Sequence, residues 1–149
     1  MSRLSRLRSL FILLVMLSSA GCAGPMGMHM SSNPPADLDY SATRTGDNGL
    51  FRATYTSATT PLAINELLTW TLHVETMEGA PVEGAIIGVS GDMPEHGHGM
   101  PTQPQVTAEL GGGDYRVEGM QFQMGGWWIV IFAIDAGGVQ DTVTFNLKL

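Results

Sequence analysis

The chain has 149 residues, a formal net charge of −7 and a single cysteine. An acidic chain repels nucleic acid, which is bound through Lys and Arg side chains that neutralise phosphates, so nucleic-acid binding is excluded. One cysteine excludes an intramolecular disulfide framework and a metal site built from several thiolates.

The first 21 residues have the pattern of a secretory signal peptide. Arg3, Arg6 and Arg8 precede an apolar run at residues 10–17, and small residues then lead into Cys22. The eight apolar residues of that run are far fewer than the roughly 20 that a permanent membrane-spanning helix needs. We therefore expect cleavage before Cys22 and export of the remainder.

The cleavage region resembles that of bacterial lipoproteins, with Cys22 as the residue that carries the lipid. Ser19 departs from the pattern, because a branched apolar residue is usual three positions before the cysteine. The resemblance implies a protein anchored to a membrane by several acyl chains. Since Ala23 and not aspartate follows, it also implies the outer membrane, facing the periplasm, if the host has two membranes. Ordinary secretion with a stray cysteine is the alternative.

Removal of the signal would leave four basic and fourteen acidic residues, a net charge of 4 − 14 = −10. Residues 22–48 then contain almost no branched apolar side chains and no sustained period, so their composition predicts a flexible tether. Residues 49–149 suffice for one small core and not for two.

Apolar and polar side chains alternate in residues 49–149 in the manner of β-strands, with glycine-rich turns between them. The predicted strands comprise residues 50–56, 66–75, 82–90, 105–110, 114–119, 127–135 and 139–149, the last two forming a hairpin. About seven short strands without an amphipathic helix favour an all-β, immunoglobulin-like antiparallel β-sandwich. Trp70 and Trp128 are its expected core residues.

Histidine and methionine gather in residues 92–104, which are rich in glycine and proline and are expected to form a loop. In an extended segment, side chains two apart point the same way, so His96 and His98 can present their imidazoles together, with Met93 and Met100 nearby. Thioether sulfur with imidazole suits Cu(I), and methionine forms no disulfides in an oxidising compartment.

A second methionine pair precedes the strand predicted at 127–135 and completes the site if both groups lie at one end of the sandwich. The predicted copper ligands are thus His96, His98, Met93, Met100, Met120 and Met124. The sequence leaves open whether the two groups meet. It also leaves open that the segment is a structural turn with solvated histidines and with methionines that pin it to the sandwich.

The tether holds a third group, formed by Met26, Met28, His29 and Met30. No fold would preorganise these side chains, so binding would have to offset their ordering entropy, and we expect at most a weak metal site. Random sequence drift in a low-complexity segment near the membrane explains these four residues equally well. His73 is expected to be a strand residue at the surface or core edge and not a ligand.

Motifs of other chemistries are missing from the sequence, including G-x-S-x-G, H-E-x-x-H, calcium loops and phosphate loops. Asp92 and Glu95 beside the histidines could form a harder, zinc-like site. A closed zinc site needs four protein ligands, however, and the sequence does not identify four. We therefore expect a protein that is not an enzyme.

The order of motifs from Met93 onward resembles the YtkA-like domain, which is related in outline to the FixH-like domain. The segment MPEHGHGM, residues 93–100, is followed by a glycine turn and then by residues shared with the pattern, namely Gly113, Tyr115, Val117, Phe122, Met124, Gly126 and Trp128. The resemblance is good over residues 93–134 and weaker over 50–92.

This resemblance implies a small immunoglobulin-like sandwich in an exported or membrane-tethered protein. It also implies partners among cation-transport or copper-enzyme assembly components, and it makes six residues signature positions, namely Met93, His96, His98, Met100, Met124 and Trp128. The leading hypothesis is a lipid-anchored protein that binds copper or a related soft cation as a carrier, sensor or assembly accessory. The alternative is a structural or partner-binding sandwich without metal.

Overall fold

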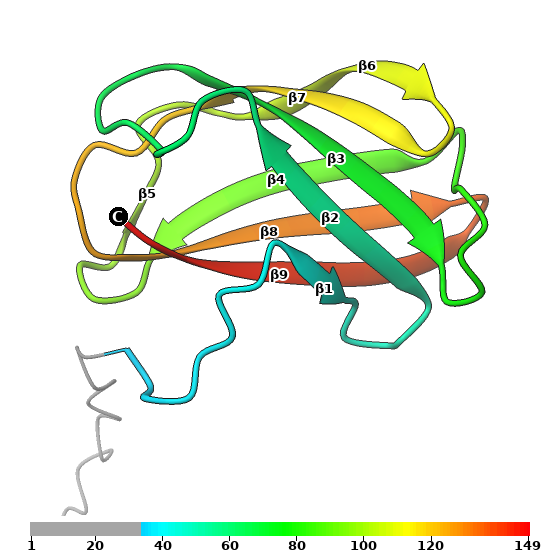
Figure 1. Cartoon of the computed structure of the whole chain (residues 1–149), viewed down its shortest axis with the longest axis horizontal. Helices are drawn as coiled ribbons and strands as arrows, with labels where there is room; N and C mark the ends of the chain where they lie inside the picture. The colour runs from blue at the N-terminus through cyan, green and yellow to red at the C-terminus, as the bar shows by residue number, and fades with distance from the viewer. Residues whose placement is uncertain (1–33) are drawn as a thin grey trace, which may run out of the picture.

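Two antiparallel sheets pack face to face in a computed structural model, which describes residues 34–149 (Figure 1). The strand orders are β1-β2-β3-β7-β6 in one sheet and β5-β4-β8-β9 in the other. The strands are β1 (Thr43–Thr45), β2 (Phe51–Ser57), β3 (Leu68–Thr76), β4 (Ile86–Met93), β5 (His98–Gly99), β6 (Gln105–Gly111), β7 (Asp114–Met120), β8 (Trp127–Ala136) and β9 (Val139–Lys148). The predicted all-β, immunoglobulin-like sandwich is confirmed.

Residues 34–149 form strands and turns and contain no helix that could cross a membrane. The predicted signal peptide, the lipidated Cys22 and the tether group from Met26 to Met30 lie outside the residues that the structure describes.

Residues 34–149 form nine strands and not the seven predicted, because two of the nine are too short to show a period in the sequence. β1 has three residues and pairs with β2, placing Arg44 opposite Ala53. β5 has two residues and pairs with β4, placing His98 opposite Met93. β1 lies within residues 22–48, so sheet pairing extends into the stretch that was predicted as tether.

The strand predicted at 82–90 lies instead at Ile86–Met93, and the predicted loop at 92–104 contains the end of β4 and all of β5. β4 begins later than predicted because the N–H groups of Gly84 and Ala85 donate to side chains of the opposite sheet and not to a neighbouring strand. They bond to the Glu109 carboxylate at 2.8 Å and the Tyr115 hydroxyl at 3.1 Å. Residues 82–85 therefore link the two sheets.

Aromatic side chains fill the space between the sheets at one end. Trp70 and Trp128 are fully buried, as expected, and Phe122 lies between them, with ring centroids 6.1 and 5.3 Å away. Trp127 faces outward and donates from its indole N–H to Asn146 at 3.1 Å. Because Phe122 belongs to the connection between β7 and β8, this cluster anchors that connection to the core.

Candidate metal centre

The β4–β5 turn and the β7–β8 connection lie side by side at one end of the sandwich, which we call the tip (residues 94–99 and 121–126). Three polar contacts join them. The Trp127 N–H donates to the Glu95 carboxylate at 3.2 Å, and the Gln123 side-chain nitrogen lies 3.1 Å from both the Gly99 carbonyl oxygen and His98 Nδ1. The structure therefore brings the histidines and the 121–126 segment together, which the sequence left open.

The two histidine rings at the tip are close to one another. Their centroids are 5.8 Å apart, and the ring planes make an angle of 32°. The segment is not extended as predicted, because His96 lies in a tight turn in which the N–H groups of His96 and Gly97 donate to the Met93 carbonyl at 3.0 and 2.9 Å. Gly97 supplies the left-handed conformation that this turn requires, with φ of 65°. The turn thus sets the spacing of the rings.

His98 is half-buried and packs edge-on against Trp128, with ring centroids 5.9 Å apart. Its Nδ1 lies 3.1 Å from the Gly99 carbonyl oxygen. In the tautomer in which Nδ1–H donates to that oxygen, Nε2 carries a free lone pair, and the Gln123 side-chain nitrogen donates to the Gly99 carbonyl alone; donation from Gln123 to Nδ1 belongs to the other tautomer. A backbone carbonyl that accepts from the second ring nitrogen is the usual support of a metal-binding histidine. His96 is exposed to solvent.

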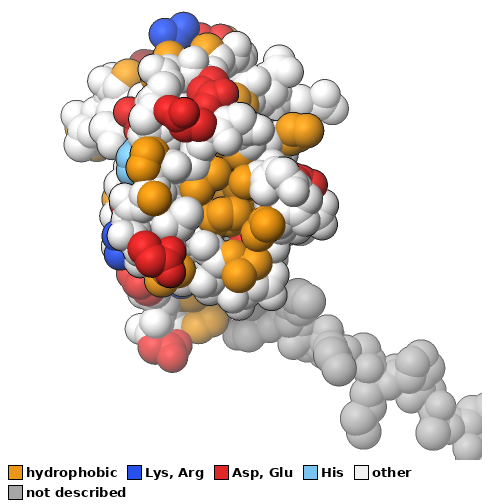
Figure 2. All heavy atoms as spheres, turned by 90° about the vertical axis from the view of Figure 1, so that its right-hand side faces the viewer, with side chains coloured by type: hydrophobic (Ala, Val, Ile, Leu, Met, Phe, Trp, Pro, Cys, Tyr) orange, Lys and Arg blue, Asp and Glu red, His pale blue; other side chains and the backbone are white. Residues whose placement is uncertain are grey.

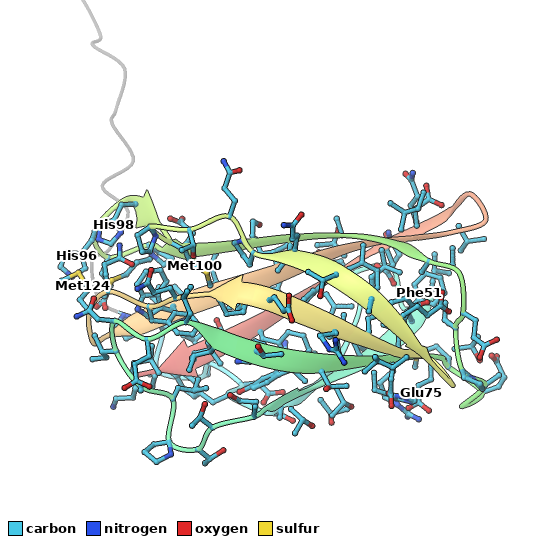
Figure 3. The ribbon with its side chains drawn as sticks, turned by 90° about the horizontal axis from the view of Figure 1, so that it is seen from above. Phe51, Glu75, His96, His98, Met100 and Met124 are labelled. Atoms are coloured by element: carbon cyan, nitrogen blue, oxygen red, sulfur yellow. The ribbon has the colours of Figure 1, made fainter. Side chains whose placement is uncertain are left out.

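Met124 and Met100 are half-buried and pack against the edge of the core. Figure 3 shows Met124 at the same end of the sandwich as His96 and His98, and Met100 further along the sandwich. The Met124 carbonyl accepts the Trp128 indole N–H at 3.0 Å, which fixes the backbone there. The Met100 side chain lies across Gly91, where any Cβ would collide with it.

Met93 and Met120 are fully buried. Met93 is opposite His98 in the β4–β5 ladder, but its methyl group lies against Gly126, and Met120 is paired with Leu68 at the end of β7. Either sulfur would have to leave the core to become an exposed ligand. Both side chains therefore act here as core packing.

Glu95 near the tip and His73, which lies elsewhere on the sandwich, both have structural partners. Among residues 34–149, no group of three or more His, Cys, Asp or Glu side chains is placed to hold a metal ion. Glu95 accepts the Trp127 N–H, and His73 lies on β3 with Nδ1 2.7 Å from the Asp114 carboxylate. The side chains at the tip that could act as soft metal ligands are the two imidazoles and the thioether of Met124.

Gln123 is a residue of the tip that the sequence analysis did not single out. Its side-chain nitrogen contacts His98, while its side-chain oxygen is buried and has no hydrogen-bond partner within residues 34–149. The one signal in the sequence is its position between Phe122 and Met124, where alternation directs it away from the core.

The fold and the tip together define a small β-sandwich domain with histidine and methionine at one end. The chain belongs to the YtkA-like family, whose model matches residues 52–133, more than half of the chain. This confirms the resemblance found in the sequence.

The fold is also similar to that of a solved protein structure. A DUF4426 family protein from Pseudomonas aeruginosa PAO1 has a TM-score of 0.50 and 16% sequence identity, covering 72% of this chain and 94% of that one. At this identity the likeness shows the fold alone. No curated protein sequence matches the chain.

Proposed function

We propose that the protein is a lipid-anchored, non-enzymatic envelope protein that binds Cu(I) or a related soft cation at the tip, as a carrier, sensor or assembly accessory. The ligands proposed are His96, His98 and Met124, with Met100 as a further thioether nearby. The observation that carries the proposal is the 5.8 Å separation of the two imidazole rings, with Met124 at the same end of the sandwich (Figure 3).

The ring separation fits one shared metal ion. An ion bound about 2.0–2.1 Å from a nitrogen of each imidazole would hold the two ring centroids about 5–6.5 Å apart. The observed 5.8 Å lies inside this range. Neutral imidazole with thioether sulfur favours Cu(I) over hard cations such as Mg²⁺. The negative charge of the chain raises the local concentration of any cation.

Membrane attachment and the class of partner rest on the sequence. The charged start, the apolar run and the small residues before Cys22 support lipidation at that cysteine. A cation-transport or copper-enzyme assembly component is the proposed partner, by family resemblance. The non-enzymatic assignment rests on the missing catalytic motifs.

A competition titration tests copper binding. The full-length chain, purified in detergent and kept under reducing conditions, competes with a chromophoric chelator for Cu(I). Replacement of Met26, Met28 and Met30 by Leu and of His29 by Ala first removes the tether donors. In this background, His96→Ala/His98→Ala should lower the Cu(I) affinity at least about 100-fold and Met124→Leu about tenfold.

The matched control is His73→Ala, since His73 lies on β3 and contacts Asp114. This variant should bind Cu(I) as tightly as its parent. Equal Cu(I) affinity in the parent and in the His96→Ala/His98→Ala variant would overturn the proposal.

Lipid attachment has a separate test. Cells labelled with a palmitate analogue should yield a labelled, membrane-associated protein, and Cys22→Ser should abolish both the label and the membrane association. A labelled Cys22→Ser variant would contradict the assignment of the anchor.

A further inference from the structure

The end of the sandwich opposite the tip, here called the distal end, carries an apolar pocket between the turns at residues 46–50, 77–85 and 136–139. Three exposed apolar side chains line it, Leu50, Met77 and Val139, which are 42, 42 and 48% exposed. Buried Phe51 and Val82 also line the pocket, whose volume is about 470 Å³. Figure 2 shows apolar side chains grouped in the centre of this face, and Figure 3 shows Phe51 at the end away from the histidines.

Carboxylates surround this pocket. Glu78 lines it directly, Asp47 belongs to the adjoining turn at residues 46–50, and Glu75 precedes it on β3. Arg52 is the cation that the structure places here, and its Nε donates to Glu75 at 2.5 Å. That hydrogen bond lowers the pKa of Glu75, which keeps the carboxylate ionised. Because Arg52 balances the charge of Glu75, the net negative charge at the rim comes from Glu78 and Asp47, and Figure 2 shows acidic side chains around the apolar group.

Hydrogen bonds hold the turns around the pocket in place. Asp141 accepts the N–H groups of Asn48 and Leu50 at 2.9 Å each, and Asp135 accepts the Gly138 N–H at 2.8 Å. Leu50 and Val139 are thus presented by turns whose shape does not depend on filling the pocket. A preformed site of this kind loses less conformational entropy on binding than a flexible one.

We propose that this pocket is a docking site for a partner protein that inserts an apolar side chain flanked by Lys or Arg. The apolar side chain would cover Leu50, Met77 and Val139, and the basic flanks would face the carboxylate rim. The proposal is independent of copper binding at the tip.

Charge disfavours the other occupants. The described part of a second copy offers four basic residues, and two of these, Arg44 and Arg52, already pair with Asp39 and Glu75. Its acidic surface would be repelled by the rim, and so would a membrane of anionic lipid. A basic partner has no such penalty.

The segment before β1 contacts the sandwich at a place away from this pocket. The Asp39 carbonyl accepts the Asn146 side-chain N–H at 3.1 Å, and Asn146 lies seven positions after Val139 on β9. At about 3.3 Å per residue, that is roughly 20 Å along the strand. The segment before β1 therefore approaches nearer the tip than the pocket.

Fluorescence anisotropy tests the docking site. The full-length chain in detergent is titrated into a labelled synthetic peptide with a central Leu-Phe pair and two arginines on each side. Binding is expected to weaken at least about tenfold in Val139→Ser and in Glu78→Lys, from loss of apolar burial and reversal of rim charge. Peptides with a Gly-Ser centre or with glutamate flanks should bind at least about tenfold more weakly than the parent peptide.

The matched control is Leu67→Ser, because Leu67 is 70% exposed and precedes β3 at the opposite end of that strand from Met77. This variant should bind the peptide like the parent, and circular dichroism checks that every variant is folded. Failure of the peptide to bind, or equal binding by the parent, Val139→Ser and Glu78→Lys, would overturn the proposal.

Two further outcomes would also overturn it. A dimer of the parent chain that Val139→Ser dissociates would identify a second copy as the occupant. Binding to anionic vesicles that Val139→Ser abolishes would identify a lipid surface. None of these results bears on Cu(I) binding at the tip, because that titration uses different residues.

Discussion

The tip and the distal end are both built from turns, but they use their polar side chains differently. At the distal end, carboxylates satisfy the backbone of the turns, with Glu83 accepting the Gly112 N–H at 2.9 Å and Asp141 holding residues 48–51. At the tip, His96 is exposed, and His98 keeps Nε2 available in the tautomer in which its Nδ1–H donates to the Gly99 carbonyl. The comparison indicates that a metal site needs ligand atoms that are not already engaged in hydrogen bonds within the fold.

The largest expected effect comes from the aromatic cluster that anchors the tip. Phe122→Ala removes the ring between Trp70 and Trp128 and should lower the free energy of unfolding by about 3–5 kcal/mol, measured by urea unfolding. It should also weaken Cu(I) binding, because the 121–126 connection loses its anchor. A loss under about 1 kcal/mol would show that this connection does not depend on the core.

A substitution at the distal end should separate stability from copper binding. Asp141→Asn leaves fewer acceptors for the N–H groups of Asn48, Leu50 and Phe51 and should cost about 2–3 kcal/mol of unfolding free energy. Cu(I) affinity should not change, because the tip keeps its geometry. A parallel loss of Cu(I) affinity would contradict the independence of the two ends.

The same carboxylate predicts how stability depends on pH. Burial raises the pKa of Asp141, but the backbone N–H donors outweigh burial and the net pKa is lowered. Because the folded-state pKa lies below the unfolded one, its contribution is present above about pH 4 and is lost as pH falls through the folded-state pKa. Urea unfolding between pH 7 and pH 3 should show a smaller acid loss in Asp141→Asn than in the parent. Equal acid losses would contradict this role.

The smallest expected effect compares two glycines with nearly the same backbone angle. Gly97 in the tip has φ of 65° and Gly137 in the β8–β9 turn has φ of 64°, and neither has an atom within 4 Å of where a Cβ would stand. Alanine at either position should cost about 1 kcal/mol of unfolding free energy. Only Gly97→Ala should weaken Cu(I) binding, because that turn positions His96. Equal Cu(I) affinities in the two variants would mean that the turn does not set the ligand geometry.

Much of the fold follows from the sequence, because alternation in β3 and in the β8–β9 hairpin is long enough to identify a buried face. The short β1 and β5 give no such signal. The late start of β4 depends on Glu109 and Tyr115, which lie far along the chain and reach residues 84 and 85 only in the folded protein.

The candidate site is predictable only in part. The pairing of His96 with His98 is visible in the sequence, which left open whether Met124 joins them, and the structure brings all three residues to one end. Met93 and Met120 were expected beside them as ligands, yet both fill the core. Thioether side chains suit both roles, and only the packing of the two sheets separates one role from the other.

The central claim is that the tip binds Cu(I) through imidazole and thioether together. X-ray absorption spectroscopy of the Cu(I)-loaded full-length chain, with the four tether donors replaced, tests it most directly. We predict nitrogen and sulfur scatterers at the copper, with the sulfur signal reduced in Met124→Leu. Copper coordinated without sulfur, or a sulfur signal unchanged in Met124→Leu, would contradict the account.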